Sequence, residues 1–275
     1  MERHGRVYLL YGREDLICDI RPIRFCGVSV QPASEALMLR FIYTIIVNIF
    51  RIFYYAPAME YYARHPERYG AEDKYALAQR LIATVKRTGR ITTEYYGVEN
   101  LPKDGGYIMF ANHQGRYDAL GVISGHKRPC SFLITRFRAN QFLAKQFFDM
   151  MGGISIDRDS VKDQMRALRE LASNVKEGKI YLVFPEGIYE KGQRNRLLEF
   201  KHGCFLSAKN AKCPIVPVAL IDSYKVFGVN SLKKVTSKVV YLEPIEYEEY
   251  NGMHVKEISE MVKGRIAEAI EKYSE

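Results

Sequence analysis

The sequence predicts an α/β fold: a mixed, mostly parallel sheet flanked by helices and preceded by an N-terminal amphipathic helical segment. Two observations predict it. From residue 91 onward, short apolar runs alternate with segments of helical periodicity, and such alternation is typical of a parallel sheet. The chain of 275 residues, with 47% hydrophobic and 27% charged residues, is also long and apolar enough for one large core.

Composition divides the chain into three regions. Residues 1–34 form an N-terminal extension that has no sustained apolar run and carries several acidic residues, unlike a signal peptide. Residues 35–90 begin with a strongly apolar stretch, and we expect a helical membrane-docking region there. Residues 91–275 carry the alternating pattern and form the predicted α/β domain.

The apolar stretch carries one polar stripe. At about 100° per residue, Arg40, Thr44, Asn48 and Arg51 point in similar directions on a helix. The segment 41–47 is far shorter than the roughly 20 residues that a membrane-spanning helix needs. We therefore expect an interfacial helix with Arg40 and Arg51 near lipid phosphates, followed by a second helix after Pro57. The alternative is an ordinary buried helix of the core.

Seven strands and five helices are predicted after residue 90. The strands are 92–96, 106–111, 130–135, 153–156, 179–184, 214–221 and 239–242. The helices are 117–124, 140–150, 160–176, 203–210 and 255–273.

The formal charge of +9 indicates a polyanionic partner, which is nucleic acid, a phosphorylated substrate or an anionic membrane. No acidic residue lies between Asp118 and Asp149, whereas five cations and five phenylalanines do. Aromatics among cations suit nucleic-acid stacking, but these phenylalanines have strand or helix spacing, which favours core or acyl-chain lining. Because the sequence also lacks a nucleic-acid-binding signature, we expect no nucleic-acid partner.

Several other chemistries lack their sequence signatures. The five cysteines form no CxxC pair, which favours reduced thiols in the cytosol. The six histidines are scattered, and no HExxH, P-loop or GxGxxG motif occurs. The sequence therefore predicts neither a metal site nor a bound cofactor.

His113 and Asp118 are the first candidate site residues. They lie five positions apart, directly after a predicted strand. One helix would point them about 140° apart, and one strand would place them on opposite faces, so contact requires a bend, which Gly115 tolerates. Asp118 would then hold one ring nitrogen and leave the other free as a base. No nucleophile motif accompanies them, so the attacking hydroxyl is expected from the substrate; the alternative is a structural loop histidine.

Two other strands end in charged residues. The predicted strand 179–184 leads into Glu186 and Gly187, and the strand 153–156 leads into Arg158. In a parallel sheet such strand ends meet at one edge, and arginine is suited to phosphate because it donates two parallel hydrogen bonds. Lys201 is one of several cations that follow Gly187. Taken alone, each feature also fits a solvated turn.

Four stretches, in order, resemble the blocks of the 1-acylglycerol-3-phosphate (lysophosphatidic acid) acyltransferase family of glycerolipid acyltransferases. They are "NHQGRYD", "GGISIDR", "FPEG" and "IVPVAL". The flanking stretches "ENLP" and "LLEFKHG" match as well, so that the resemblance covers about residues 93–242, more than half of the chain.

The resemblance implies an O-acyltransferase in which His113 is the general base and Asp118 orients it. An acceptor hydroxyl attacks the thioester of acyl-CoA or acyl-carrier protein, a co-substrate, without a covalent acyl-enzyme. The product is phosphatidic acid. The acceptor-binding positions are Arg158, Glu186 and Gly187, and we add Lys201 because of its charge and position.

The resemblance also implies partners and a location: lysophosphatidic acid, the acyl donor and anionic membrane lipids, with the protein peripheral or monotopic on the cytoplasmic face of the membrane. Two departures leave the acceptor open. Gly115 stands where the family commonly has serine, and Ile188-Tyr189-Glu190 stands where it commonly has Thr-Arg-Ser. Another lysophospholipid or a glycolipid hydroxyl fits too, and a noncatalytic protein that binds anionic lipid is the competing hypothesis.

Overall fold

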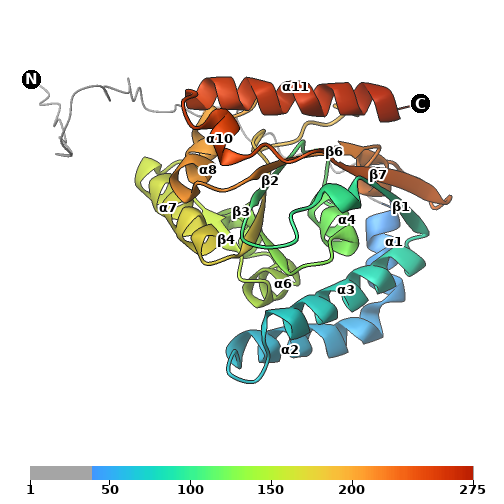
Figure 1. Ribbon diagram of the computed structural model, residues 1–275. Helices are drawn as coiled ribbons and strands as arrows, with labels where there is room; N and C mark the ends of the chain where they lie inside the picture. Colours follow the sequence, from blue (N-terminus) through green and yellow to red (C-terminus); the bar gives the residue numbers. More distant parts are fainter. Residues whose placement is uncertain (1–38, 275) are drawn as a thin grey trace, which may run out of the picture.

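A seven-stranded sheet forms the centre of the molecule in the computed structural model, which describes residues 39–274 (Figure 1). The predicted extension, residues 1–34, lies outside this range. In sheet order the strands are β1 (Ile91–Tyr96), β7 (Val235–Tyr241), β6 (Ile215–Ile221), β2 (Ile108–Ala111), β5 (Ile180–Val183), β3 (Cys130–Thr135) and β4 (Ile154–Ile156).

The sheet is mixed and mostly parallel, as the sequence predicts. The strands β6, β2, β5, β3 and β4 are parallel neighbours, whereas β7 runs antiparallel to β6 and parallel to β1. All seven predicted strands are present, and the largest difference is that β7 begins at Val235, four residues before the predicted start at residue 239. The carboxyl ends of the five parallel strands therefore share one edge of the sheet.

Helices cover both faces of the sheet (Figure 1). Side chains alternate along each strand, so in β2 Ile108 and Phe110 contribute to one core cluster and Met109 and Ala111 to the other. On the first face lie α7 (Val161–Lys176), α8 (Leu206–Ala211) and α11 (Val255–Tyr273). On the second lie α2 (Ile49–Arg64), α3 (Ala71–Thr88), α4 (Asp118–Gly125) and α6 (Ala144–Met150). The short helices are α5 (Arg136–Ala139), α9 (Tyr224–Gly228) and α10 (Tyr247–Tyr250).

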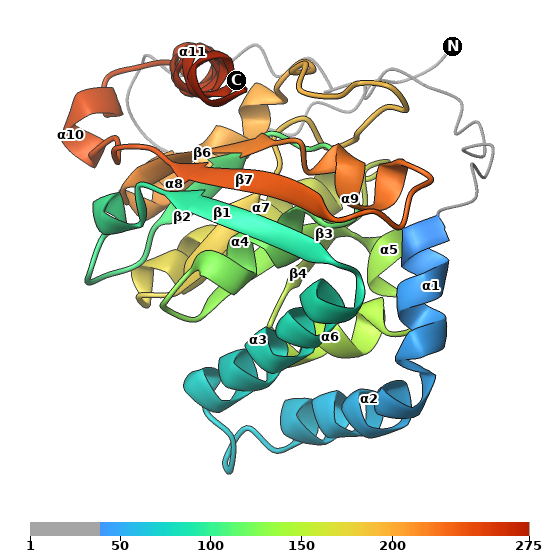
Figure 2. The same ribbon diagram turned by 90° about the vertical axis from the view of Figure 1, so that its right-hand side faces the viewer.

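The N-terminal segment is a bent pair of helices along one side of the domain (Figure 2). The helices α1 (Leu39–Val47) and α2 meet at 80° around Asn48. The Asn48 amide donates to the Thr44 carbonyl and to the Thr88 hydroxyl, and such side-chain bonding competes with helix continuation. The predicted break at Pro57 is wrong, because α2 begins at Ile49 and runs through Pro57.

The polar stripe of α1 faces the protein. Arg40 is 2% exposed, and its guanidinium donates to the carbonyl oxygens of Lys225, Val226 and Lys233. Burying a cation is costly unless hydrogen bonds compensate it, and these three carbonyls, from α9 and the following turn, accept from Nη1 and Nη2, whereas the buried Nε has no partner. The prediction that Arg40 lies near lipid phosphates is therefore wrong. Arg51 is exposed.

The apolar faces of α1 and α2 point outward. Phe50 is 85%, Phe53 74% and Ile46 64% exposed, so these helices are not the buried core helices of the alternative hypothesis. Among residues 39–274, no single helix is long and apolar enough to cross a membrane, whereas α1 and α2 taken together meet that test only as a pair bent by 80°.

The burial of Arg40 yields a stability prediction. Arg40→Met should lower the free energy of unfolding by about 3 kcal/mol, because three carbonyl oxygens lose a charged donor. Arg51→Met is the matched control, since Arg51 is exposed and donates to Asn48; it should cost under about 0.5 kcal/mol. Urea unfolding of both variants measures the difference. Equal midpoints would contradict the assigned role of Arg40.

Candidate active site

The structure brings His113 and Asp118 together. β2 ends at Ala111, a short loop follows, and α4 begins at Asp118. Across this strand, turn and helix, His113 Nδ1 lies 2.8 Å from Asp118 Oδ2. The bond fixes the ring orientation and leaves Nε2 as the nitrogen available to a substrate.

Asp118 is held by three further donors. It is 1% exposed, and its carboxylate accepts hydrogen bonds from the amides of Gln114 and Gly115 and from the Ser223 hydroxyl. The bend does not require glycine, because Gly115 has no positive φ, and a Cβ added there would meet nothing closer than Tyr224 Cα at 3.9 Å. Gly115 instead contributes its N–H to Asp118.

Aromatic rings confine the His113 side chain. The Phe184 ring stacks on it, with centroids 4.4 Å apart, and the Tyr189 ring meets it edge to face at 4.7 Å. The His113 side chain nevertheless retains 18% exposure. Among the described residues, no serine, threonine or cysteine side chain forms a hydrogen bond with the ring. Nε2 of the imidazole is therefore available for a proton, and within residues 39–274 no hydroxyl or thiol is bonded to the ring.

Glu186 lies beneath the same loop. It is 1% exposed; Oε1 accepts from the His113 amide at 3.2 Å, and Oε2 accepts from Gln193 Nε2 at 2.9 Å. Burial raises the pKa of Glu186 to about 7, partly offset by these hydrogen bonds. The Gln193 amide also donates to the His113 carbonyl, so Glu186 and Gln193 together fix both sides of the His113 backbone.

The remaining predicted positions gather at this edge of the sheet. The Arg158 guanidinium donates to the Gly187 carbonyl, which joins the exits of β4 and β5. Gly187 itself has a φ of +70°, a conformation that favours glycine. The Lys201 amide donates to the Pro185 carbonyl at 2.8 Å, which places Lys201 beside the "FPEG" turn, and its side chain is half-buried.

Sequence reasoning missed two supporting residues, Ser223 and Gln193. Ser223 follows β6, and the rule that pointed to His113 and Arg158, a polar residue just after a parallel strand, would also have found it. Gln193 lies inside a long loop, and no local pattern marks it.

The fold and the site define a class of protein: a mixed α/β domain with a hydrogen-bonded histidine–aspartate pair at the carboxyl edge of its sheet. Residues 92–221 match the protein family described as Acyltransferase. The 1-acyl-sn-glycerol-3-phosphate acyltransferase alpha of Ovis aries is 28% identical over 190 residues, which are 66% of this chain and 64% of that protein. The 1-acyl-sn-glycerol-3-phosphate acyltransferase of Escherichia coli is 29% identical over 160 residues, 56% of this chain and 63% of that enzyme. These matches support the resemblance of the four sequence blocks to the glycerolipid acyltransferases.

A solved structure supports the fold. The crystal structure of the 1-acyl-sn-glycerophosphate (LPA) acyltransferase PlsC from Thermotoga maritima matches with a TM-score of 0.70 at 19% identity, covering 86% of this chain and 95% of that one. The matched regions span 64% of the sheep relative and 63% of the E. coli relative.

The raised pKa of Glu186 predicts a pH-dependent stability. The folded state binds the Glu186 proton more tightly than the unfolded chain does. The stability gained from this proton is therefore complete below pH 4.5 and is lost as the pH rises through about 7. Glu186→Gln lacks this titration. Relative to the variant, the wild type should therefore lose about 3 kcal/mol of stability between pH 4 and 8. Urea unfolding of both proteins across this range measures it, and a constant difference would contradict the buried, protonatable carboxyl.

Proposed function

We propose that this protein transfers an acyl chain from a thioester, acyl-CoA or acyl-carrier protein, to the free hydroxyl of 1-acylglycerol-3-phosphate, which gives phosphatidic acid. The observation that carries the proposal is the 2.8 Å bond between His113 Nδ1 and buried Asp118, made within a sheet edge that also gathers Arg158 and Lys201. The names of the curated relatives support the same reaction.

The proposed chemistry is direct transfer. His113 Nε2 accepts the proton of the acceptor hydroxyl while the oxygen attacks the thioester carbonyl. The tetrahedral intermediate then expels the thiolate, which takes the proton from the imidazolium. Asp118 keeps the ring oriented and stabilises its positive charge during this step. The absence of a hydroxyl or thiol bonded to His113 within residues 39–274 fits a mechanism without an acyl-enzyme.

We assign the other positions according to their contacts. Arg158 and Lys201 supply positive charge for the acceptor phosphate. Gly187 fixes Arg158 through its carbonyl oxygen, and the turn depends on its positive φ. Glu186 acts as a positioning residue, because both of its oxygens accept hydrogen bonds from the protein itself, one of them from the His113 amide.

The exposed apolar faces of α1 and α2 are the proposed membrane-docking surface. Large apolar side chains that no protein element covers are typical of an interfacial site. The most exposed of them are Ile46, Phe50, Phe53 and Tyr54. We propose a peripheral position on the cytoplasmic face, in which this surface enters the lipid headgroup region and brings the active site to a membrane-embedded acceptor.

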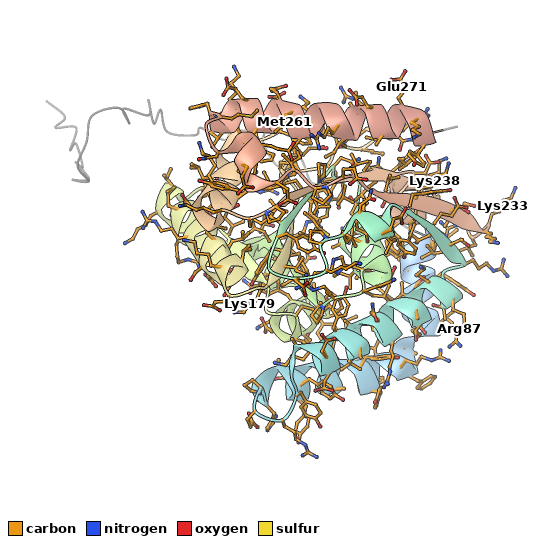
Figure 3. The ribbon with its side chains drawn as sticks, viewed as in Figure 1. Arg87, Lys179, Lys233, Lys238, Met261 and Glu271 are labelled. Carbon is orange, nitrogen blue, oxygen red and sulfur yellow. The ribbon has the colours of Figure 1, made fainter. Side chains whose placement is uncertain are left out.

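Cations beside α1 fit an anionic membrane surface. A depression next to α1 is lined by Arg194, Lys225, Lys233 and Lys234, together with part of Arg40. Figure 3 shows Lys233 extending outward from the turn before β7, on the side of the molecule where α1 lies. Basic side chains near an anionic surface contribute about 1 kcal/mol each.

The activity test is release of free thiol from acyl-CoA, with and without 1-acylglycerol-3-phosphate. His113→Ala should lower kcat by roughly 10²–10⁴-fold, since the general base is lost. Asp118→Asn should also lower it, because the ring loses a charged partner. Circular dichroism controls for folding. Lipid binding without acceptor-dependent thiol release by the wild type would favour the noncatalytic alternative.

The docking surface has its own test. Phe50→Asp combined with Phe53→Asp should release the protein from anionic vesicles and lower activity on membrane-presented acceptor, whereas activity on a short-chain soluble acceptor persists. Val161→Asp, an exposed apolar position on α7, is the matched control and should change neither. Vesicle cosedimentation measures binding. Unchanged binding by the double variant would exclude this surface.

A further inference from the structure

Tyr189 connects His113 to an arginine of α5. On one side, the Tyr189 ring meets the His113 ring edge to face. Beyond it, Arg138 Nη2 donates to the Tyr189 hydroxyl at 3.2 Å, and the Arg138 guanidinium carbon lies 5.5 Å from the centre of the Tyr189 ring. Arg138 is therefore held one side chain away from the proposed base.

Arg138 and Arg158 bond to the same short loop, Arg138 to the Tyr189 hydroxyl and Arg158 to the Gly187 carbonyl two positions earlier. Burial lowers the pKa of the Arg158 guanidinium, and the positive charge of Arg138 lowers it further, whereas Asp159 has a weaker opposite effect. Within the described part of the chain, neither Arg138 nor Arg158 forms a salt bridge. By contrast, Arg136, two positions before Arg138, pairs with Asp157 and Asp163. Two neighbouring cations without a carboxylate partner form an environment that favours an anion.

We propose that Arg138 is a second phosphate-binding side chain of the acceptor site, that Tyr189 positions it, and that Arg138 and Arg158 together select an acceptor with a phosphate monoester. This inference rests on the proposed acyl transfer and specifies its acceptor. Residues 188–190 of the loop carry no cation, so α5 supplies the second guanidinium from outside the sequence blocks that mark the family.

The chemistry of the acceptor requires that the phosphate-binding side chains lie close to His113. In 1-acylglycerol-3-phosphate the free hydroxyl and the phosphate are on adjacent carbons, so the phosphate lies close to whichever nitrogen removes the hydroxyl proton. Arg158 bonds to Gly187, and Arg138 bonds to Tyr189. Gly187 and Tyr189 belong to the loop that flanks His113. Both guanidinium groups are thus held at one loop beside His113, and our proposal is that one phosphate binds there.

Charge gives the selectivity. A phosphate monoester carries nearly two negative charges at pH 7, because its second pKa is about 6, whereas a phosphodiester carries one. A pair of arginines without carboxylates therefore favours the monoester over the diester, and over a neutral glyceride still more.

The experiment compares three acceptors that differ only at the headgroup: 1-acylglycerol-3-phosphate, its phosphate methyl ester and 1-acylglycerol. Arg138→Ala should raise KM for the monoester about 10-fold or more, with kcat within about threefold, and should change KM for the methyl ester much less. Arg138→Lys should recover part of the loss. Tyr189→Phe keeps the ring beside His113 but removes the hydroxyl, and should shift KM in the same direction by a smaller factor.

Arg136→Ala is the control for charge. Arg136 lies two positions before Arg138 and is already paired with Asp157 and Asp163. Its replacement also removes one positive charge, but it should leave the ratio of the KM values for the two phosphorylated acceptors unchanged. The melting temperature of each variant monitors folding. Equal losses of kcat/KM on all three acceptors, or the same result for Arg136→Ala as for Arg138→Ala, would overturn the role of Arg138 while the proposed reaction stands. If the wild type released no thiol with any acceptor, both proposals would fall.

Discussion

The buried carboxylate of Asp118 is the constraint on which the site depends. It accepts from His113 Nδ1, from two backbone amides and from the Ser223 hydroxyl, so it binds the loop after β2, the start of α4 and the loop after β6 to one point. An ionised group is stable at 1% exposure only with such compensation. The same bonds that keep Asp118 buried therefore also determine which nitrogen of His113 is left free.

One short helix connects this carboxylate to the proposed docking surface. Ser223, which bonds to Asp118, directly precedes α9, and the buried guanidinium of Arg40 in α1 binds carbonyl oxygens of that helix. A second connection is the Arg116 guanidinium, from the loop between β2 and α4, which lies over the Phe41 ring of α1, 5.4 Å from its centre. The polar stripe of α1 is thus used for attachment, which leaves its apolar face exposed. An inverted orientation would bury the apolar face and give no surface for lipid.

The sequence predicts the fold well, because strand and helix periodicity are local properties, and all seven strands are present. The contact of His113 with Asp118 is likewise local, since one turn joins the two residues. The strand-end rule identifies Ser223 as a candidate residue, but the bonds of Ser223 to Asp118 and of Arg138 to Tyr189 join distant segments, so no spacing reveals which side chains pair. The same limit explains the error at Arg40: periodicity shows that α1 has a polar stripe, but it does not show that carbonyls of α9 would meet it.

The central claim is that Asp118 holds the proton of the neutral His113 ring on Nδ1 and keeps Nε2 free to act as the base. Nitrogen-15 NMR of the histidine-labelled protein tests it most directly, with His113 assigned by its absence from the His113→Ala spectrum. At a pH where the ring is neutral, the account predicts a protonated Nδ1 and an unprotonated Nε2, and a loss of this preference in Asp118→Asn. A His113 ring with its proton on Nε2 in the wild type would contradict it.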